Sequence, residues 1–172
     1  SGELETPSPG LDPETFVSWE AGMKFAGQKF SAQAAYFRTD GSDVIIRSPT
    51  GLVINGAAEV TKKNASDLQV DGIEAQLTYL VLPQLLLFAD GMIIDGEADA
   101  FPAANSPMVR EPIDLLMPTS WRVGARWTAA SSRLRLEALV ERADAQDQLS
   151  SRDLADTQRI PPGGTPGYTV FG

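Results

Sequence analysis

The stretch SWRVGARWTAASSRLRLEALVERA, residues 120–143, carries the clearest pattern in the chain. Apolar and polar side chains alternate on both sides of a short break at residues 129–132. Before the break, Trp121, Val123, Ala125 and Trp127 alternate with Arg122, Gly124, Arg126 and Thr128, and after it Leu134, Leu136, Ala138 and Val140 alternate with Arg133, Arg135, Glu137 and Glu141. A period of two is typical of strands with one apolar and one polar face, so the stretch predicts an antiparallel hairpin.

The same alternation recurs along the rest of the chain. It predicts further strands at residues 14–26, 30–38, 73–79 and 85–94, and the start of a seventh strand at residues 168–171. Residues 44–46 can prolong the second of these strands beyond an irregularity at residues 40–41. Within residues 85–94 the apolar face stays open, because Phe88 shares its face with both Asp90 and Met92.

The connections between the expected strands alternate in length. Short turns are expected near residues 27–29, 82–84 and 129–132, and long loops near residues 48–66, 95–118 and 143–166, with a loop at residues 1–13 leading into the first strand. Short turns at one end and long loops at the other are typical of outer-membrane barrels, whose tilted strands need about ten alternating residues each. The pattern therefore predicts an all-β fold over residues 14–172, an antiparallel up-and-down meander that forms either part of a transmembrane β-barrel or a soluble sandwich.

Aromatic residues fall near the two ends of the expected strands. Phe25, Phe30, Tyr79 and Trp127 lie close to the short turns, whereas Trp19, Tyr36 and Trp121 lie six residues further along their strands. Six residues tilted by about 45° cover roughly 14 Å, so the two sets are expected at the two interfaces of a thin apolar band. The alternative is that they are core aromatics of a soluble sandwich.

Composition excludes several classes of site. The 172 residues contain no histidine and no cysteine, so the chain itself supplies no Ser-His-Asp triad, thiol nucleophile or zinc site. With 14 basic against 23 acidic residues the net charge is −9, which argues against a nucleic-acid partner. We expect no catalytic residue, no metal site and no cofactor.

Several segments resemble, in order, those of TonB-dependent outer-membrane receptors. They are LDPETFVSWEAGMKF at residues 11–25, AAYFRTDGSDVII at 34–46, DLQVDGIEAQLTY at 67–79, LFADGMIIDGEAD at 87–99, PTSWRVGARW at 118–127 and DTQRIPPGGTPGYTVF at 156–171. The resemblance implies a barrel of about 22 strands around a plug. It also implies TonB-energised uptake of a siderophore, cobalamin, haem or similar large solute across the outer membrane of a Gram-negative bacterium. We expect the chain to be a piece of such a barrel, in contact with outer-membrane lipid, with the part that engages TonB lying outside it.

The long loops are the expected place for ligand contacts, because binding residues concentrate on loops held by a rigid scaffold. The candidates are Asp95, Glu97, Asp99, Arg110, Glu111, Asp144 and Asp147. The spacing of Asp95, Glu97 and Asp99 matches a calcium loop, but Ala100 and Ser106 stand where that loop needs glycine and glutamate. These acids therefore predict a solvated loop.

Two other functions stay open at this point. The second hypothesis is a soluble all-β ligand-binding module, either a lipocalin-like barrel or a sandwich. The third is a carbohydrate-active β enzyme, since a pair of loop carboxylates could do glycosidase chemistry, although no pair stands out.

Overall fold

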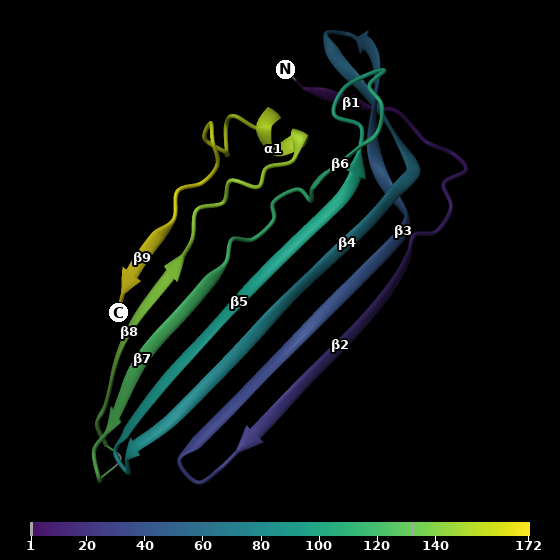
Figure 1. Ribbon diagram of the computed structural model, residues 1–172. Coiled ribbons are helices and arrows are strands. Elements are labelled where there is room, and N and C mark those ends of the chain that lie inside the picture. The colour runs from purple at the N-terminus through teal and green to yellow at the C-terminus, as the bar shows by residue number, and fades with distance from the viewer. Residues whose placement is uncertain (1, 132) are drawn as a thin grey trace.

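A computed structural model describes residues 2–131 and 133–172, which form one large antiparallel sheet (Figure 1). The strands of its main path are β2 (Thr15–Ala26), β3 (Phe30–Ile54), β4 (Ala57–Leu82), β5 (Leu85–Ala100), β7 (Ser120–Thr128), β8 (Arg135–Ala143) and β9 (Tyr168–Phe171). Each strand of this path pairs antiparallel with the next one. The predicted all-β meander is therefore confirmed, as an open sheet with β2 and β9 at its edges.

The two ends of the sheet differ in their connections (Figure 1). The turns from β2 to β3, from β4 to β5 and from β7 to β8 lie together at one end, which we call the short-turn end. The tip of β3–β4, strand β6 (Val109–Pro112) and helix α1 (Ser151–Ala155) lie at the opposite end, which we call the long-loop end. Residue 132 of the predicted turn at 129–132 and residue 1 of the predicted loop at 1–13 lie outside the described residues.

The prediction of a loop at residues 48–66 is wrong. Strand β3 continues to Ile54 and β4 begins at Ala57, so the two form a hairpin that extends far beyond the neighbouring strands. Its turn is Asn55-Gly56, whose φ angles of 51° and 84° suit the tight turn that joins twisted strands. Register shifts between Gly41 and Val44 and between Pro49 and Val53 interrupt the period of two, which is why the sequence pattern is lost there.

The predicted loops at residues 95–118 and 1–13 are also partly wrong. Strand β5 runs on to Ala100, and β6 folds back against its last four residues. Near the other terminus, strand β1 (Glu3–Glu5) pairs parallel with residues 58–60 of β4. Both short strands pair with the unpaired edge of a long neighbour, and with three and four residues neither is long enough for a period of two to be recognised in the sequence. Residues 144–167 contain the five-residue α1 and a single bridge between Gln146 and Thr165.

Cross-strand pairing settles which side of β5 is apolar. Asp90 stands opposite Gln76 and Phe88 stands opposite Thr78, so both lie on the polar side of the sheet. Leu87 stands opposite Tyr79 on the other side. A large aromatic ring therefore belongs to the polar face, and this is the reason that the alternation in β5 was ambiguous.

Candidate functional site

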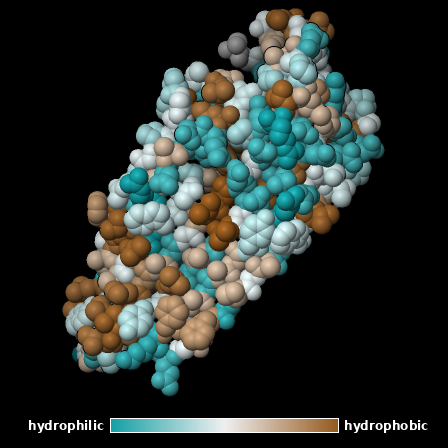
Figure 2. Space-filling model, viewed as in Figure 1, coloured by the Kyte–Doolittle hydropathy of each residue, from teal (hydrophilic) through white to brown (hydrophobic). Residues whose placement is uncertain are grey.

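One face of the sheet is apolar, and we call it the apolar face. Met23 and Val17 on β2 are 77% and 62% exposed, so this face does not pack against another part of the described chain. Exposed apolar side chains continue across it at Ile73, Leu77, Leu87, Ile93, Val123 and Leu136. An apolar surface of this extent is typical of a protein surface that faces lipid or a partner. In Figure 2, apolar side chains gather towards the short-turn end and polar ones dominate towards the long-loop end.

The seven aromatic residues singled out from the sequence all lie on the apolar face. They are Trp19, Phe25, Phe30, Tyr36, Tyr79, Trp121 and Trp127. Two pairs are in contact: the ring centroids of Trp19 and Tyr36 are 5.2 Å apart, and those of Phe25 and Phe30 are 5.9 Å apart. The Phe25–Phe30 contact joins β2 and β3 close to the short-turn end, and the Trp19–Tyr36 contact joins them nearer the long-loop end. The two contacts therefore lie towards the two ends of the apolar face.

The opposite side of the sheet, which we call the polar face, contains a hollow of about 780 Å³. The charged and amide side chains that line it come from six strands: Glu20, Lys24, Gln33, Glu74, Gln76, Asp90, Arg122 and Glu141. Cross-strand hydrogen bonds order this surface, including one of 2.8 Å from the Gln33 amide to the Gln76 carbonyl oxygen. Such pairs satisfy the polar groups of a face that meets water or another polar domain.

A charged cluster on β5, β7 and β8 continues this face towards the short-turn end. Arg122 pairs with Asp90 at 2.8 Å, and Arg126 pairs with Glu137 at 2.6 Å. Both guanidinium groups also approach the ring of Phe88, at 5.8 and 5.5 Å from its centroid. The arginines thereby shield an aromatic ring on an otherwise polar face.

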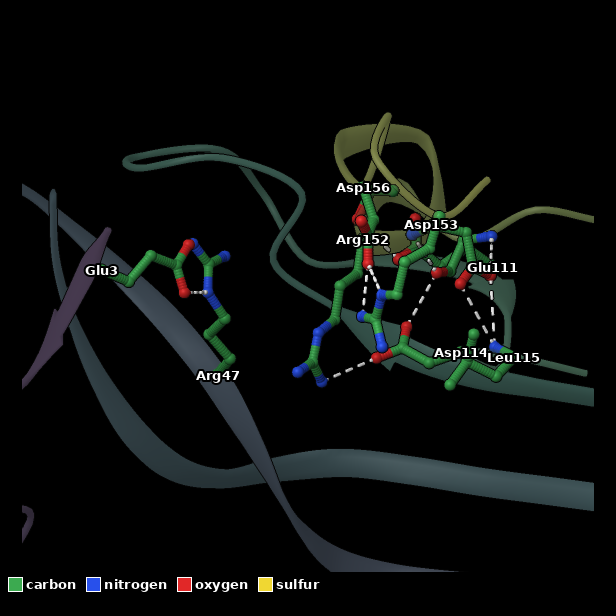
Figure 3. A network of polar contacts seen from close by, with 11 residues as sticks. Glu3, Arg47, Glu111, Asp114, Leu115, Arg152, Asp153 and Asp156 are labelled. Atoms are coloured by element: carbon green, nitrogen blue, oxygen red, sulfur yellow. Dashed lines mark hydrogen bonds and ion pairs between the residues drawn. The ribbon is translucent and has the colours of Figure 1, made fainter. Parts of the chain in front are cut away.

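At the long-loop end, two connections are joined by a buried polar contact (Figure 3). Ser150 is fully buried and Asp153 is 4% exposed; both belong to the connection that contains α1. The Asp153 carboxylate accepts hydrogen bonds from the backbone N–H of Leu115, at 3.2 and 3.3 Å, and from that of Ser150 at 3.1 Å. The Ser150 hydroxyl donates to Asp114 at 2.7 Å. The loop after β6 and the loop after β8 are thus held as one unit, which we call the loop clamp.

The loop clamp has further contacts at its edges. Arg152 pairs with Asp114 at 3.0 Å, and Gln146 donates to the carbonyl of Leu116 at 2.7 Å. Just after α1, a hydrogen bond from the Arg159 guanidinium lowers the pKa of Asp156. Charges in this region are therefore mostly satisfied within the protein.

The structure brings together only some of the ligand-binding candidates from the sequence. Arg110 of β6 lies between Glu97 at 3.4 Å and Asp99 at 3.6 Å on β5. Glu111 accepts a hydrogen bond of 2.7 Å from Ser151 of α1, whereas Asp144 pairs with Arg142 at 3.2 Å. The Asp95 carboxylate accepts from the backbone N–H of Gly96 at 3.0 Å, and Asp147 is exposed in the loop after β8. The seven residues do not form a single site.

Sequence reasoning missed the residues of the loop clamp. Asp114, Ser150, Arg152 and Asp153 meet across 36 or more positions in the chain. One local signal was present, because Ser150 and Asp153 form a capping box at the start of α1. That signal predicts the short helix but not its contact with residues 114 and 115.

A second hollow, of about 320 Å³, lies at the long-loop end between the β3–β4 hairpin and the segment after β5. Its lining consists of Ser48, Pro49, Thr50, Thr61, Lys63, Phe101, Ala103, Asn105 and Ser106. The hairpin itself is braced from another strand, since Glu3 and Glu5 of β1 pair with Arg47 and Lys62, the latter at 3.2 Å. Figure 3 shows the contact between Glu3 and Arg47.

Comparisons with known proteins agree with this geometry. The family model described as TonB dependent receptor-like, beta-barrel, matches residues 1–172. The fold is similar to that of the copper transporter OprC, with a TM-score of 0.71 and 15% identity, over 95% of this chain and 23% of that one. It is also similar to the FrpB iron transporter from Neisseria meningitidis (F3-3 variant), with a TM-score of 0.64 and 13% identity, over 98% of this chain and 25% of that one. The chain thus spans about a quarter of each of these structures. A search of curated proteins finds no match.

No helix among residues 2–131 and 133–172 is long and apolar enough to cross a membrane.

Proposed function

The chain belongs to the TonB-dependent receptor-like β-barrel family, whose model it matches over residues 1–172, and we propose that it forms consecutive wall strands of an outer-membrane receptor that takes up a large solute. The single observation that carries this proposal is the two-sided sheet. One face exposes a continuous apolar surface, and the other holds an ordered set of charged and amide side chains around a hollow. In a barrel wall the first face meets lipid and the second lines the lumen.

The aromatic residues fit this placement. Trp19 with Tyr36 lies at the outer interface of the apolar segment, and Phe25 with Phe30 lies at the inner one. On β7, Trp121 and Trp127 lie six residues apart on a single strand, and Tyr79 is the cross-strand partner of Phe30. Aromatic rings are favoured at both interfaces because one part of the ring system is apolar and the other is polarisable or hydrogen-bonding.

The long-loop end faces the outside of the cell and meets the solute. The loop clamp and β6 give this surface a defined shape, and residues 95–99, 110–111 and 144–147 lie on it or beside it. Uptake takes place through the complete barrel, is energised by TonB and involves no catalysis by this chain. The solute is a metal-bearing or similarly large compound such as a siderophore, haem or cobalamin. The names of the two similar structures, a copper and an iron transporter, support a metal-bearing solute.

An uptake assay with the full-length receptor tests this function. Cells that carry the intact gene are compared with a deletion strain and with a TonB-deficient strain for accumulation of radiolabelled iron, as ferric siderophores and haem, and of labelled copper and cobalamin. We expect one of these solutes to accumulate only when both the receptor and TonB are present.

Equal accumulation of every solute in all three strains contradicts the uptake function. Recovery of the folded receptor from the soluble fraction, without detergent, contradicts the membrane placement independently of the solute.

A further inference from the structure

The smaller hollow at the long-loop end holds a lysine that pairs with no carboxylate among the described residues. Lys63 on β4 lines the hollow, and no described residue forms an ion pair with it. Its ammonium lies 5.6 Å from the centroid of the Phe101 ring, which also lines the hollow. A cation–π contact orients the ammonium but leaves its N–H donors available to a ligand.

The neighbouring lysine shows that this arrangement is particular to Lys63. Lys62 stands opposite Arg47 and pairs with Glu5 at 3.2 Å, whereas Lys63 stands opposite Ile46 and lines the hollow. Successive residues of a strand point to opposite sides, so the two ammonium groups lie on different faces of the hairpin. Most basic side chains in this acidic chain are neutralised by carboxylates, and Lys63 is an exception that faces into a hollow.

The rest of the lining supplies polar groups of fixed position. Ser48 is 5% exposed, and the Ser106 hydroxyl donates to the carbonyl of Ala103 at 2.7 Å while accepting from its N–H at 3.2 Å. Asn105 has a φ of 60°, a left-handed conformation that asparagine tolerates, and it is one of the residues that line the hollow. One carboxylate lies nearby: Glu59 accepts a hydrogen bond of 2.7 Å from the hydroxyl of Thr50. Thr50 holds that carboxylate by a hydrogen bond, Glu59 itself does not line the hollow, and the ammonium of Lys63 is the one cationic group among the lining residues.

We infer that this hollow is a binding site for an oxyanion group, a carboxylate or a phosphate, held by the ammonium of Lys63 and the amide of Asn105. A hollow of about 320 Å³ admits such a group together with part of a sugar or a small ring. The inference rests on the proposed function only in placing this end of the sheet outside the cell. The oxyanion belongs either to a soluble solute or to the phosphorylated sugars of a lipid in the outer leaflet, and both present the same chemistry.

Competitive labelling of lysines in the full-length receptor tests the inference. The detergent-purified protein is treated with a limiting amount of N-hydroxysuccinimidyl acetate, and acetylation is measured by mass spectrometry at Lys29, Lys62 and Lys63. Cleavage after Glu59 and Asp67 yields one peptide with both Lys62 and Lys63, which fragmentation distinguishes. Glucose 6-phosphate and gluconate are the soluble probes, with glucose as the neutral control. Phosphorylated lipid A in mixed micelles is the lipid probe, with phosphatidylethanolamine micelles as its control.

We expect at least one anionic probe to slow acetylation of Lys63 by about threefold when its concentration is twice the Kd, because one site protects by the factor 1 + [L]/Kd. Lys62 and Lys29 should react at unchanged rates. Protection by the sugar acids identifies a soluble ligand, and protection by lipid A alone identifies the lipid. The variant Asn105→Gly keeps the left-handed backbone but removes the amide, and it should weaken this protection.

The inference is overturned if no anionic probe slows the acetylation of Lys63. It is also overturned if Lys62 and Lys63 are slowed equally, since that result reports general screening. The labelling does not depend on transport, so a failed uptake assay together with protected Lys63 would reject the proposed function and leave the oxyanion site standing.

Discussion

The ring of Phe88 on β5 lies directly over Gly124 on β7. The two residues are cross-strand partners, and a Cβ atom at Gly124 would lie 2.4 Å from the Phe88 Cζ and 2.8 Å from the carbonyl oxygen of Ala138. Only glycine leaves room for the ring at this position. In this position the Phe88 ring lies 5.8 and 5.5 Å from the guanidinium groups of Arg122 and Arg126.

The variant Gly124→Ala should therefore destabilise the barrel by about 1–3 kcal/mol, the usual effect of overpacking. In a protein that already carries Phe88→Ala, the Gly124→Ala substitution should cost less, because the clash with the Phe88 ring is gone. Urea unfolding of the full-length receptor in detergent measures both effects. Gly91→Ala is the matched control, since its Cβ would come no closer than 3.2 Å to its neighbours. Equal effects of the two glycine substitutions would contradict this account.

The loop clamp predicts that two loops lose order together. Asp153→Ala removes the acceptor for the N–H groups of Leu115 and Ser150, and leaving buried donors unpaired costs about 1–3 kcal/mol. Hydrogen–deuterium exchange should then accelerate at residues 113–116 as well as at 149–156, by about tenfold for each 1.4 kcal/mol. Asp147→Ala, an exposed acid of the same loop, should change neither segment. Acceleration confined to residues 149–156 would show that the loops are independent.

An added charge should change the stability of the barrel on one face of β4 and leave it nearly unchanged on the other. Ala75 lies in the middle of the apolar face, between Ala34 and Gly91, whereas Gln76 lines the hollow of the polar face. Arginine at a lipid-facing position near the bilayer midplane costs about 2–4 kcal/mol, so Ala75→Arg should be strongly destabilising. Gln76→Arg should be close to neutral. The temperature at which the folded receptor unfolds on a semi-native gel measures the difference, and a milder effect at Ala75 than at Gln76 contradicts the assignment.

Much of the fold follows from local alternation in the sequence. The hairpin of β7 and β8 and its two faces were predicted, because Trp121, Val123 and Trp127 face one side and Arg122 and Arg126 face the other. The order of the strands followed from the lengths of their connections. These features depend on neighbouring residues, which a single sequence displays directly.

The remaining features depend on contacts between distant segments. The hairpin over residues 48–66 was missed because its bulges break the period, and β6 was missed because four residues ending in Pro112 carry no alternation. The pairing of Asp114 with Ser150 joins loops that have no pattern in common. The apolar face of β5 could not be assigned from the sequence, because Phe88 lies on the polar face in contact with Arg122 and Arg126 of another strand.

The alternation of environments along β4 tests the central claim most directly. The chain contains no cysteine, so single cysteines at residues 73–79 give unique spin-label positions in this segment. In the full-length receptor reconstituted in lipid, we expect oxygen accessibility to peak at Ile73, Ala75 and Leu77. Accessibility to a water-soluble nickel complex should peak instead at Glu74, Gln76 and Thr78. Two out-of-phase profiles with a period of two are the predicted result. Coincident profiles, or equal water access on both faces, would contradict the placement of the apolar face in lipid.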